Sequence, residues 1–467
     1  MSNICTTAQM QAWREMTDAR IEHILHSPDM PLSTTAPTFY VSNDGDDDND
    51  GTTPETPWRS LDKVNATPLP PGTVVRFRRG DLWRGQIRAK TGVTYTAYGC
   101  GDKPKLYGSP MNGANPTLWE PTDTVHIWRF QGWPEDIGTI VFDHGKAHGI
   151  KAIVRTEKDG STWNNTTGER FLSWRDLTAD LHFYHDLSDG SVYLHSMENP
   201  GVRFSSIEFS VKRHGFAIQG SDVTIDNFCV CYVGSHGVGA GTTQGLTVQN
   251  CAFYWIGGSI QAEGLFGRNH ATRYGNAVEI YGGCDRYTVQ DCYFYQIYDA
   301  AVTHQVGLSQ KQKDDVADLS QTHIRYQRNV MEFCNYSIEY FLGGILEGNP
   351  SHMEDLVIED NYMWYAGRGL CSQRPDKTEA AHIKSWNHDN PACDYHVRNN
   401  LMVDSYNMLI HIHANVRGPG NSDGMPTMEG NIFVARNGDS FGNLAFGDPT
   451  RQVYPVELPG NQMWLIP

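Results

Sequence analysis

The stretch Gly245-Leu246-Thr247-Val248-Gln249-Asn250-Cys251-Ala252-Phe253 is matched by Arg286-Tyr287-Thr288-Val289-Gln290-Asp291-Cys292-Tyr293-Phe294. Each copy begins with alternating apolar and polar residues, which is typical of a strand, and continues through Asn or Asp at a turn into a second apolar strand. Further copies occupy residues 222–228, 355–363, 395–402 and 425–433. Neighbouring copies lie roughly 20 to 40 residues apart, which is a period typical of repeat folds.

The repeat predicts a right-handed, single-stranded parallel β-helix. One turn of such a chain cannot bury its apolar face alone, whereas stacked turns share a continuous core. Asn and Asp tolerate the left-handed backbone that a tight turn needs. In this register Cys251 and Cys292 form an inward ladder. A β-propeller would need four antiparallel strands in each repeat, and this period is too short for that.

Composition agrees with an all-β chain and excludes some function classes. The 467 residues include 46 Gly, and 19% of the residues are charged. The formal net charge of -17 and the lack of a basic stripe predict no nucleic-acid partner. No stretch approaches 18 apolar residues, so we expect no membrane span, while the oligomeric state stays open.

The cysteines and the first residues predict a cytoplasmic protein. The ten cysteines form no compact disulfide pattern, and several lie inside expected strands. Residues 1–17 show no basic segment followed by an apolar one, as a secretory signal would require.

The rest of the chain divides around the repeat. Residues 6–26 have helical spacing of apolar residues, and we expect this helix to cover the first turn of the β-helix; 1–37 is the helix with its linker. The β-helix domain is expected over 38–467. An inserted β-rich subdomain is expected at about 110–205, with a hairpin formed by the segments 181–186 and 190–194.

The opening of the expected domain carries a recognisable order of motifs. A Tyr-Val-Ser strand at 38–42 runs into an Asp-rich turn at 43–52, and Pro-Gly-x-x-Val follows at 71–75. Together with the later repeats, this order resembles the pectate-lyase-like right-handed β-helix superfamily over roughly residues 38–450. The segments 256–258, 274–279 and 298–305 resemble the glycoside hydrolases of that superfamily.

The resemblance implies a carbohydrate-active enzyme without fixing the reaction, because the superfamily includes hydrolases, lyases and epimerases. Its hydrolases use paired Asp and Glu residues, whereas its lyases commonly use Lys or Arg with calcium. We predict no cofactor. For the turn at Asp44–Asp50, a structural calcium ion and a solvated turn both fit the residues, although no Glu closes a calcium loop there.

Long segments interrupt the repeat at 257–274, 306–321, 343–354 and 374–393. Because they follow comparable points of the repeat, we expect them to rise on one side and wall a cleft. Three strands lead into them, and alignment on Ala277, Ala301 and Ser337 places Glu279 and Glu339 in one outward column. A shift of one residue would instead pair Val302 with Glu339 and turn that side chain to the other face.

The predicted catalytic residues are Asp299, Glu339 and Glu279, in that order. Two rungs at about 4.8 Å each separate the two glutamates, so their backbones lie roughly 10 Å apart, which suits a pair of glycosidase carboxyl groups. The predicted substrate-binding residues are His304, Gln305, Tyr281, Tyr340, Arg273, Arg374, His411 and Trp386. No His spacing specifies a metal site, and none is predicted.

The sequence therefore predicts a glycoside hydrolase that cleaves oligosaccharides by carboxylate acid/base catalysis. A polysaccharide lyase or uronate epimerase is the first alternative. A glycan-binding β-helix without catalytic activity is the second.

Overall fold

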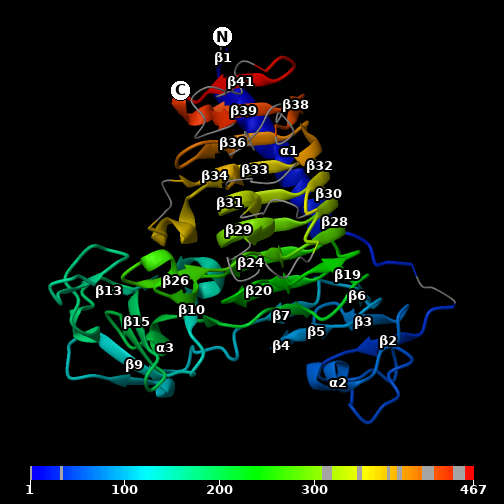
Figure 1. The fold of residues 1–467 in the computed structure, drawn as a ribbon. Helices are drawn as coiled ribbons and strands as arrows, with labels where there is room; N and C mark the ends of the chain where they lie inside the picture. The colour runs from blue at the N-terminus through cyan, green and yellow to red at the C-terminus, as the bar shows by residue number, and fades with distance from the viewer. Residues whose placement is uncertain are drawn as a thin grey trace.

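The computed structural model describes residues 3–31, 35–307, 318–343, 350–375, 379–386, 392–412, 425–444 and 458–467. The chain is a right-handed parallel β-helix: successive turns stack along one axis, as Figure 1 shows from the green to the red strands. Most turns contribute one strand to each of three parallel sheets. The predicted fold class is confirmed.

The first sheet contains the repeat strands that precede the Asn or Asp turn. Its members are β2 (Thr38–Val41), β3 (Val74–Arg78), β6 (Thr94–Tyr98), β19 (Thr224–Asp226), β23 (Thr247–Gln249), β28 (Cys284–Gln290), β30 (Gln321–Gln327), β32 (Met353–Glu359), β35 (Ala392–Arg398) and β38 (Thr427–Glu429), and the short β22 (Thr243–Gln244) also pairs with β28.

The second sheet follows that turn. It contains β4 (Leu82–Arg84), β7 (Lys105–Tyr107), β20 (Cys229–Val233), β24 (Ala252–Ile256), the first parts of β29 (Tyr293–Gly307) and β31 (Val330–Gly343), β33 (Tyr362–Ala366), β36 (Leu401–Ser405), β39 (Ile432–Ala435) and β41 (Gln462–Leu465).

The third sheet carries the predicted catalytic glutamates. It contains β5 (Ile87–Ala89), β18 (Phe216–Ile218), β21 (Val238–Ala240), β27 (Val278–Tyr281), the second parts of β29 and β31, β34 (Ala381–Ser385), β37 (Ile410–Ile412) and β40 (Gly442–Leu444). Because β29 and β31 run through both sheets, the second and third sheets are continuous at these two turns.

The turn between the first and second sheets uses the left-handed backbone that the repeat predicts. The turn residues have φ between 51° and 61°: Asn227, Asn250, Asp291, Arg328, Asp360 and Asn399. The side chain after each turn points inward. Cys251 and Cys292 are fully buried there, which agrees with the predicted inward ladder. On later turns the same position holds a ladder of asparagines that begins at Asn329 and ends at Asn461.

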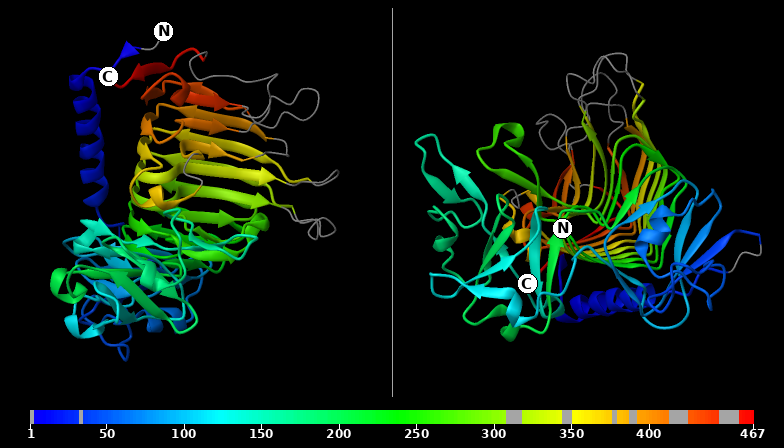
Figure 2. Two further views of the ribbon diagram at one scale, coloured as in Figure 1. Left: turned by 90° about the vertical axis from the view of Figure 1, so that its left-hand side faces the viewer. Right: turned by 90° about the horizontal axis from the view of Figure 1, so that it is seen from below.

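From the sequence we expected helix α1 (Thr7–Leu25) to cover the first turn of the β-helix, and this prediction is wrong. The helix lies along the side of the stack, against the outer face of the second sheet (Figure 2, left). Ile24 packs against Ala252, Tyr293 and Val330, which belong to successive turns. Strand β1 (Asn3–Ile4), just before the helix, pairs with β41 at the opposite end of the stack. The apolar side of α1 thus covers the outward apolar residues of the second sheet.

The β-rich insertion contains a five-stranded sheet of β8 (Trp119–Pro121), β9 (Ile127–Gln131), β12 (Ile150–Lys151), β15 (His182–Asp186) and β16 (Ser191–His195). A hairpin of β13 (Val154–Thr156) and β14 (Thr162–Asn164) extends from it. Strand β10 (Ile137–Phe142) pairs with β11 (Ala147–His148) and with β17 (Ile207–Val211), which joins the insertion to the stack. The predicted hairpin is the β15–β16 pair.

Short helices complete the described elements: α2 (Leu61–Ala66), α3 (Pro200–Arg203) and the 3-10 turns η1 (Pro116–Leu118), η2 (Asp143–Gly145), η3 (Trp174–Asp176), η4 (Leu265–Gly267), η6 (Gly369–Gln373) and η8 (Asp439–Phe441). Among the helices in the described part of the chain, none combines the length and apolar character that a membrane crossing requires.

Candidate active site

An outward column of side chains crosses the third sheet at one position of each turn. Strand pairing aligns Gly239 with Glu279, Glu279 with Thr303, and Thr303 with Glu339. The column continues through Lys384 and His411. The predicted column of Glu279 and Glu339 is confirmed.

The alternative register is excluded, because Val302 pairs with Ile338 and not with Glu339. Val302, Ile338 and Val278 lie in the apolar core, so the residues that follow them must face outward.

Glu339 lies in a protected environment on this outward face. Only 5% of the residue is exposed, and its Oε1 accepts a hydrogen bond of 2.6 Å from the indole nitrogen of Trp386. Burial raises the pKa of Glu339 to about 8, with a further contribution from the negative charge of Asp299. The Trp386 hydrogen bond and the charge of Arg374 act in the opposite direction. The Glu339 carboxyl group is therefore largely protonated at neutral pH.

Asp299 lies at the bend of β29 between the second and third sheets and is 4% exposed. Its Oδ1 lies 2.5 Å from a guanidinium nitrogen of Arg374, which follows η6. A buried positive charge at this distance favours the ionised carboxylate. Asp299 and Glu339 thus have environments that favour opposite protonation states.

A series of contacts through two aromatic rings leads from Arg374, the partner of Asp299, to Glu339. The Arg374 guanidinium lies 5.7 Å from the ring centre of Tyr336, and the Tyr336 and Trp386 rings are 6.3 Å apart. Trp386 in turn donates to Glu339. These contacts restrict the orientation of both acidic groups, because rigid rings fix each partner.

Glu279 lies two strands below Glu339, with 12% of its side chain exposed. Asn276 donates a hydrogen bond to its Oε2, and the Nδ1 atom of His236 lies 3.2 Å from the same oxygen. Burial raises the pKa of Glu279 to about 7, although the Asn276 hydrogen bond and His214 oppose the shift. These three neighbours are not among the predicted site residues. A signal was present, because His214-Gly215 and His236-Gly237 precede aligned strands.

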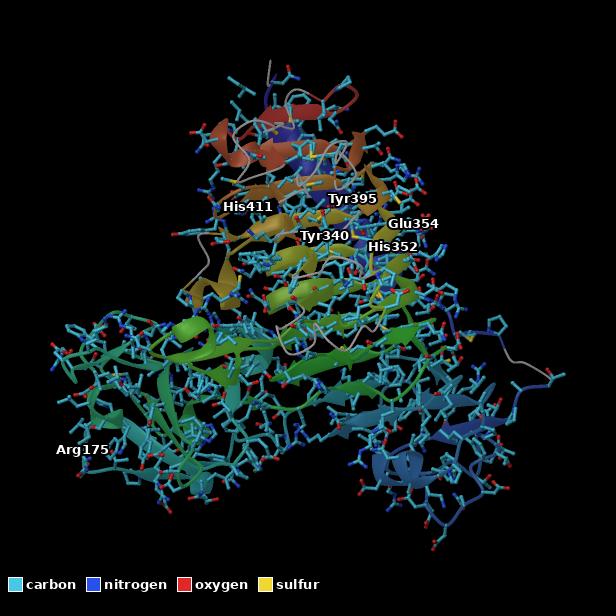
Figure 3. All side chains as sticks on the ribbon, in the orientation of Figure 1. Arg175, Tyr340, His352, Glu354, Tyr395 and His411 are labelled. Atoms are coloured by element: carbon cyan, nitrogen blue, oxygen red, sulfur yellow. The ribbon has the colours of Figure 1, made fainter. Side chains whose placement is uncertain are left out.

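Two of the predicted substrate-binding residues face the interior, and the prediction is wrong for them. His304 pairs with Ile280 and Tyr340, so strand alternation turns all three inward. His304 is fully buried, and its Nδ1 atom lies 2.7 Å from the hydroxyl of Tyr326. The Tyr340 ring packs against Tyr395 of the first sheet (both labelled in Figure 3) inside the β-helix.

The other predicted binding residues lie on or near the outward face. Tyr281, 50% exposed, and Gln305 occupy the outward position two residues beyond the acidic column. His411 is buried in the column itself, where its Nδ1 atom lies 2.9 Å from Nζ of Lys384. Trp386 contacts Glu339, as described above. These positions can present rings and polar groups to a sugar chain.

Arg374 and Arg273 line a pocket between the β-helix and the insertion. The insertion contributes Ile153, Asn165 and Thr166. Other walls come from the segment 268–274, from Tyr298 and from the end of η6, which lies just above β26 in Figure 1. Arg273 donates to the carbonyl oxygens of Gly258 and Gly138, at 2.6 and 2.9 Å, so its predicted substrate contact would compete with a structural role.

Of the four interruptions expected to wall a cleft, the segment 257–274 is described almost completely. It forms the hairpin of β25 (Ser259–Glu263) and β26 (Ala271–Tyr274) beside the insertion. The central parts of the other three, residues 308–317, 344–349, 376–378 and 387–391, lie outside the described residues.

Several carboxylates of the Asp-rich turn accept hydrogen bonds from nearby backbone amides. Asp47 accepts hydrogen bonds from the backbone amides of Arg59 and Ser60, both at 2.9 Å, and Asp50 accepts from Thr52. Across the part of the chain that the structure describes, no three His, Cys, Asp or Glu side chains gather as a metal site. The calcium expectation for this turn remains a prediction.

The three parallel sheets and their left-handed turns decide the fold, which is a parallel β-helix. Known proteins resemble this chain in part of its sequence or in its fold. No protein-family model matches this β-helix. One curated protein, the lacto-N-biosidase of Bifidobacterium longum subsp. longum, is 24% identical over 274 residues. The match involves 45% of this chain and 16% of that much longer protein.

Solved structures similar to this β-helix include carbohydrate-active proteins. A protein described as a glycoside hydrolase has a TM-score of 0.49 at 10% identity, with 92% of this chain and 96% of that chain covered. A GH136 lacto-N-biosidase from Eubacterium ramulus has a TM-score of 0.39 at 14% identity, covering 98% and 71%. The family 28 exopolygalacturonase of Yersinia enterocolitica has a TM-score of 0.40 at 12% identity, covering 90% and 68%.

Proposed function

We propose that this chain is a glycoside hydrolase that cleaves O-glycosidic bonds in oligosaccharides by carboxylate acid/base catalysis. The observation that carries the proposal is the contrast between Glu339 and Asp299. Burial keeps a proton on Glu339, whereas Arg374 favours the ionised form of Asp299. Glycosidases need this combination of a protonated and an ionised carboxyl group in one site.

In the proposed reaction, Glu339 protonates the oxygen of the leaving sugar as the glycosidic bond breaks. Asp299 acts on the opposite side, either as the base that activates a water molecule or as the nucleophile. Trp386 holds the Glu339 carboxyl group through its indole hydrogen bond, and Arg374 holds Asp299. The exposed ring of Tyr281 provides a surface for a neighbouring sugar.

The names of the similar proteins support the same class of substrate. The lacto-N-biosidase that matches in sequence and the solved glycoside hydrolases act on glycosidic bonds. Alginate lyases also occur among the similar structures. The products must therefore distinguish hydrolysis from elimination.

The test compares wild-type protein with Asp299→Asn and Glu339→Gln on natural oligosaccharides and on aryl glycosides. On natural substrates we expect each variant to lose about 10²- to 10⁴-fold in kcat/KM, the usual contribution of a general acid or base. On an aryl glycoside with a good leaving group, Glu339→Gln loses much less, because that departure needs little proton transfer. Asp299→Asn stays impaired on both kinds of substrate.

Glu354→Gln is the matched control, since Glu354 lies on the first sheet with 51% of its side chain exposed (labelled in Figure 3). Wild-type rates in both active-site variants would refute the proposed roles. Products with an ultraviolet-absorbing unsaturated end would identify a lyase instead. Sugar binding without any turnover would favour the glycan-binding alternative.

A further inference from the structure

Three side chains stack beside Glu279 at one position of successive turns. Strand pairing aligns Phe216 with Val238 and Val238 with Val278, so His214, His236 and Asn276 occupy equivalent places two residues earlier. The rings of His214 and His236 stack with centres 5.2 Å apart. Gly239, directly below Glu279 in the column, leaves room for this stack, because a Cβ atom there would lie 2.8 Å from His214.

Hydrogen bonds fix which groups carry protons. The backbone amide of Asn276 donates to Nδ1 of His236 over 3.1 Å. A backbone amide always carries its hydrogen, so Nδ1 must be the unprotonated nitrogen of a neutral ring. Burial also lowers the pKa of His236 to about 4, which agrees with a neutral imidazole.

The orientation of the Asn276 side chain is fixed in the same way. Its Oδ1 accepts a hydrogen bond of 2.7 Å from the amide of Ala300, next to Asp299. Its amide nitrogen therefore faces Glu279 and donates to Oε2. Asn276 thus ties Glu279 to the backbone that carries Asp299.

The remaining contact decides the state of Glu279. Its Oε2 lies 3.2 Å from Nδ1 of His236, whose lone pair already faces this region. Two acceptors at that distance repel each other, unless the carboxyl oxygen carries a proton and donates it. A three-centre hydrogen bond then joins Glu279, His236 and the Asn276 amide.

We infer that Glu279 is a neutral, hydrogen-bonding carboxylic acid of this site, held by His236 and Asn276, and is not its base or nucleophile. This inference rests on the proposed function for its role: Glu279 positions a hydroxyl group of the sugar that occupies the rungs below Glu339. His236 and Asn276 are positioning residues that act through Glu279.

The charges around Glu279 agree with this role. His214 and His236 face it from the preceding turns, and burial lowers both of their pKa values to about 4. Glu339 faces it from two strands above and is itself largely protonated. Neither histidine therefore carries a full positive charge at neutral pH, and burial governs the carboxyl group and raises its pKa to about 7.

A direct test needs no substrate. We would record infrared difference spectra of wild-type protein minus Glu279→Gln from pH 5 to pH 9, together with nitrogen NMR of the histidine rings. The inference expects a protonated-carboxyl band at pH 6 that disappears above pH 8, and a neutral His236 with Nδ1 unprotonated throughout. A missing band at pH 6, or a charged His236 ring beside an ionised Glu279, would overturn it.

A kinetic test addresses the role in the proposed reaction. Glutamine mimics a neutral acid, so Glu279→Gln is expected to lose about tenfold less in kcat/KM than Glu279→Ala. For the wild type we expect KM to rise with pH as Glu279 ionises, and we expect this rise to be absent in Glu279→Gln, while the pH dependence of kcat assigned to Glu339 remains. Equal losses in both variants would show that an ionisable group is required. If the protein hydrolyses no glycoside, the spectra still decide the state of Glu279.

Discussion

Single side chains acquire their chemical roles here from burial more than from their type. Glu339 and the exposed Glu354 are both strand glutamates, but only Glu339 lies beneath Trp386 and close to Asp299. Taking a carboxyl group out of water disfavours its charged form. The same burial that prepares Glu339 as an acid must therefore reduce the stability of the fold at higher pH.

Because the charged form of a buried carboxyl group is costly, we predict that Glu339→Gln becomes more stable than the wild type as pH rises. The folded-state pKa of about 8 exceeds the ordinary glutamate pKa of 4.5, so the folded state binds more protons between those limits. The wild type therefore loses stability with rising pH over this window, by at most about 1.4 kcal/mol per pH unit from this group. Glutamine carries no charge and avoids the loss.

Thermal unfolding at pH 5 and pH 9 measures the effect. The advantage of Glu339→Gln over the wild type is expected to be larger at pH 9, whereas Glu354→Gln shows no such difference. An equal change at the two pH values would mean that Glu339 is not desolvated as the structure indicates.

At the scale of elements, the asparagine ladder holds successive turns in register. The Oδ1 atom of Asn361 accepts from both the backbone and the side chain of Asn329, and its amide group donates to Asn400 and to the carbonyl of Tyr326. Every bond is between 2.8 and 3.0 Å. Buried polar groups of this kind are costly when a partner is removed.

Asn361→Ala is therefore expected to lower the free energy of unfolding by on the order of 3 kcal/mol, because several buried donors and acceptors lose their partner. Urea unfolding followed by circular dichroism measures the loss. Asn461→Ala serves as the control, since that residue ends the ladder and is partly exposed. A ladder without energetic importance would give equal, small losses in the two variants.

At the scale of the whole molecule, a buried ion pair inside the insertion lies where the insertion meets the β-helix, and its carboxylate links the two parts. Asp136 pairs with Lys151 and accepts a hydrogen bond of 2.6 Å from the amide of Ile260 in β25. Burial opposes the ionised form of Asp136, but Lys151 and His185 outweigh it and hold its pKa well below the usual range. Gln373 adds a second link through the backbone of Gly149 and Lys151.

Asp136→Ala leaves the Lys151 charge unpaired inside the protein and is expected to cost about 3–5 kcal/mol. Hydrogen exchange is expected to rise in β9, β15 and β16. Because the insertion lines the pocket beside Arg374, KM for oligosaccharides should rise more than kcat falls. The double variant Asp136→Ala/Lys151→Met recovers part of the stability.

Asp123→Ala is the matched control for this interface. Asp123 pairs with Arg175 on the surface of the insertion (Arg175 is labelled in Figure 3), and both side chains are more than half exposed. Its loss is expected to have little effect on stability, because solvent screens an exposed ion pair. Equal effects of the two single variants would show that the buried pair does not fasten the insertion.

The sequence by itself determined the β-helix and the turn positions, and it offered the register that aligns Glu279 with Glu339 as one of two, between which the strand pairing decided. The β-helix and its turns followed because the side-chain period of two and the Asn or Asp turn recur on most coils, and both are local properties. Strand alternation also indicates that His304 and Tyr340 point inward, because they pair at the same position as the inward-facing Ile280. That part of the prediction failed although the necessary pattern was present.

Only the tertiary structure decided which groups surround the acidic side chains. Arg374 reaches Asp299 from a separate segment, His236 reaches Glu279 from an earlier turn, and α1 covers the side of the stack instead of its end. Repeat spacing determines where a residue lies on its own coil. It cannot determine which long interruption folds back over that coil, because those contacts depend on the docking of side chains far apart in the chain.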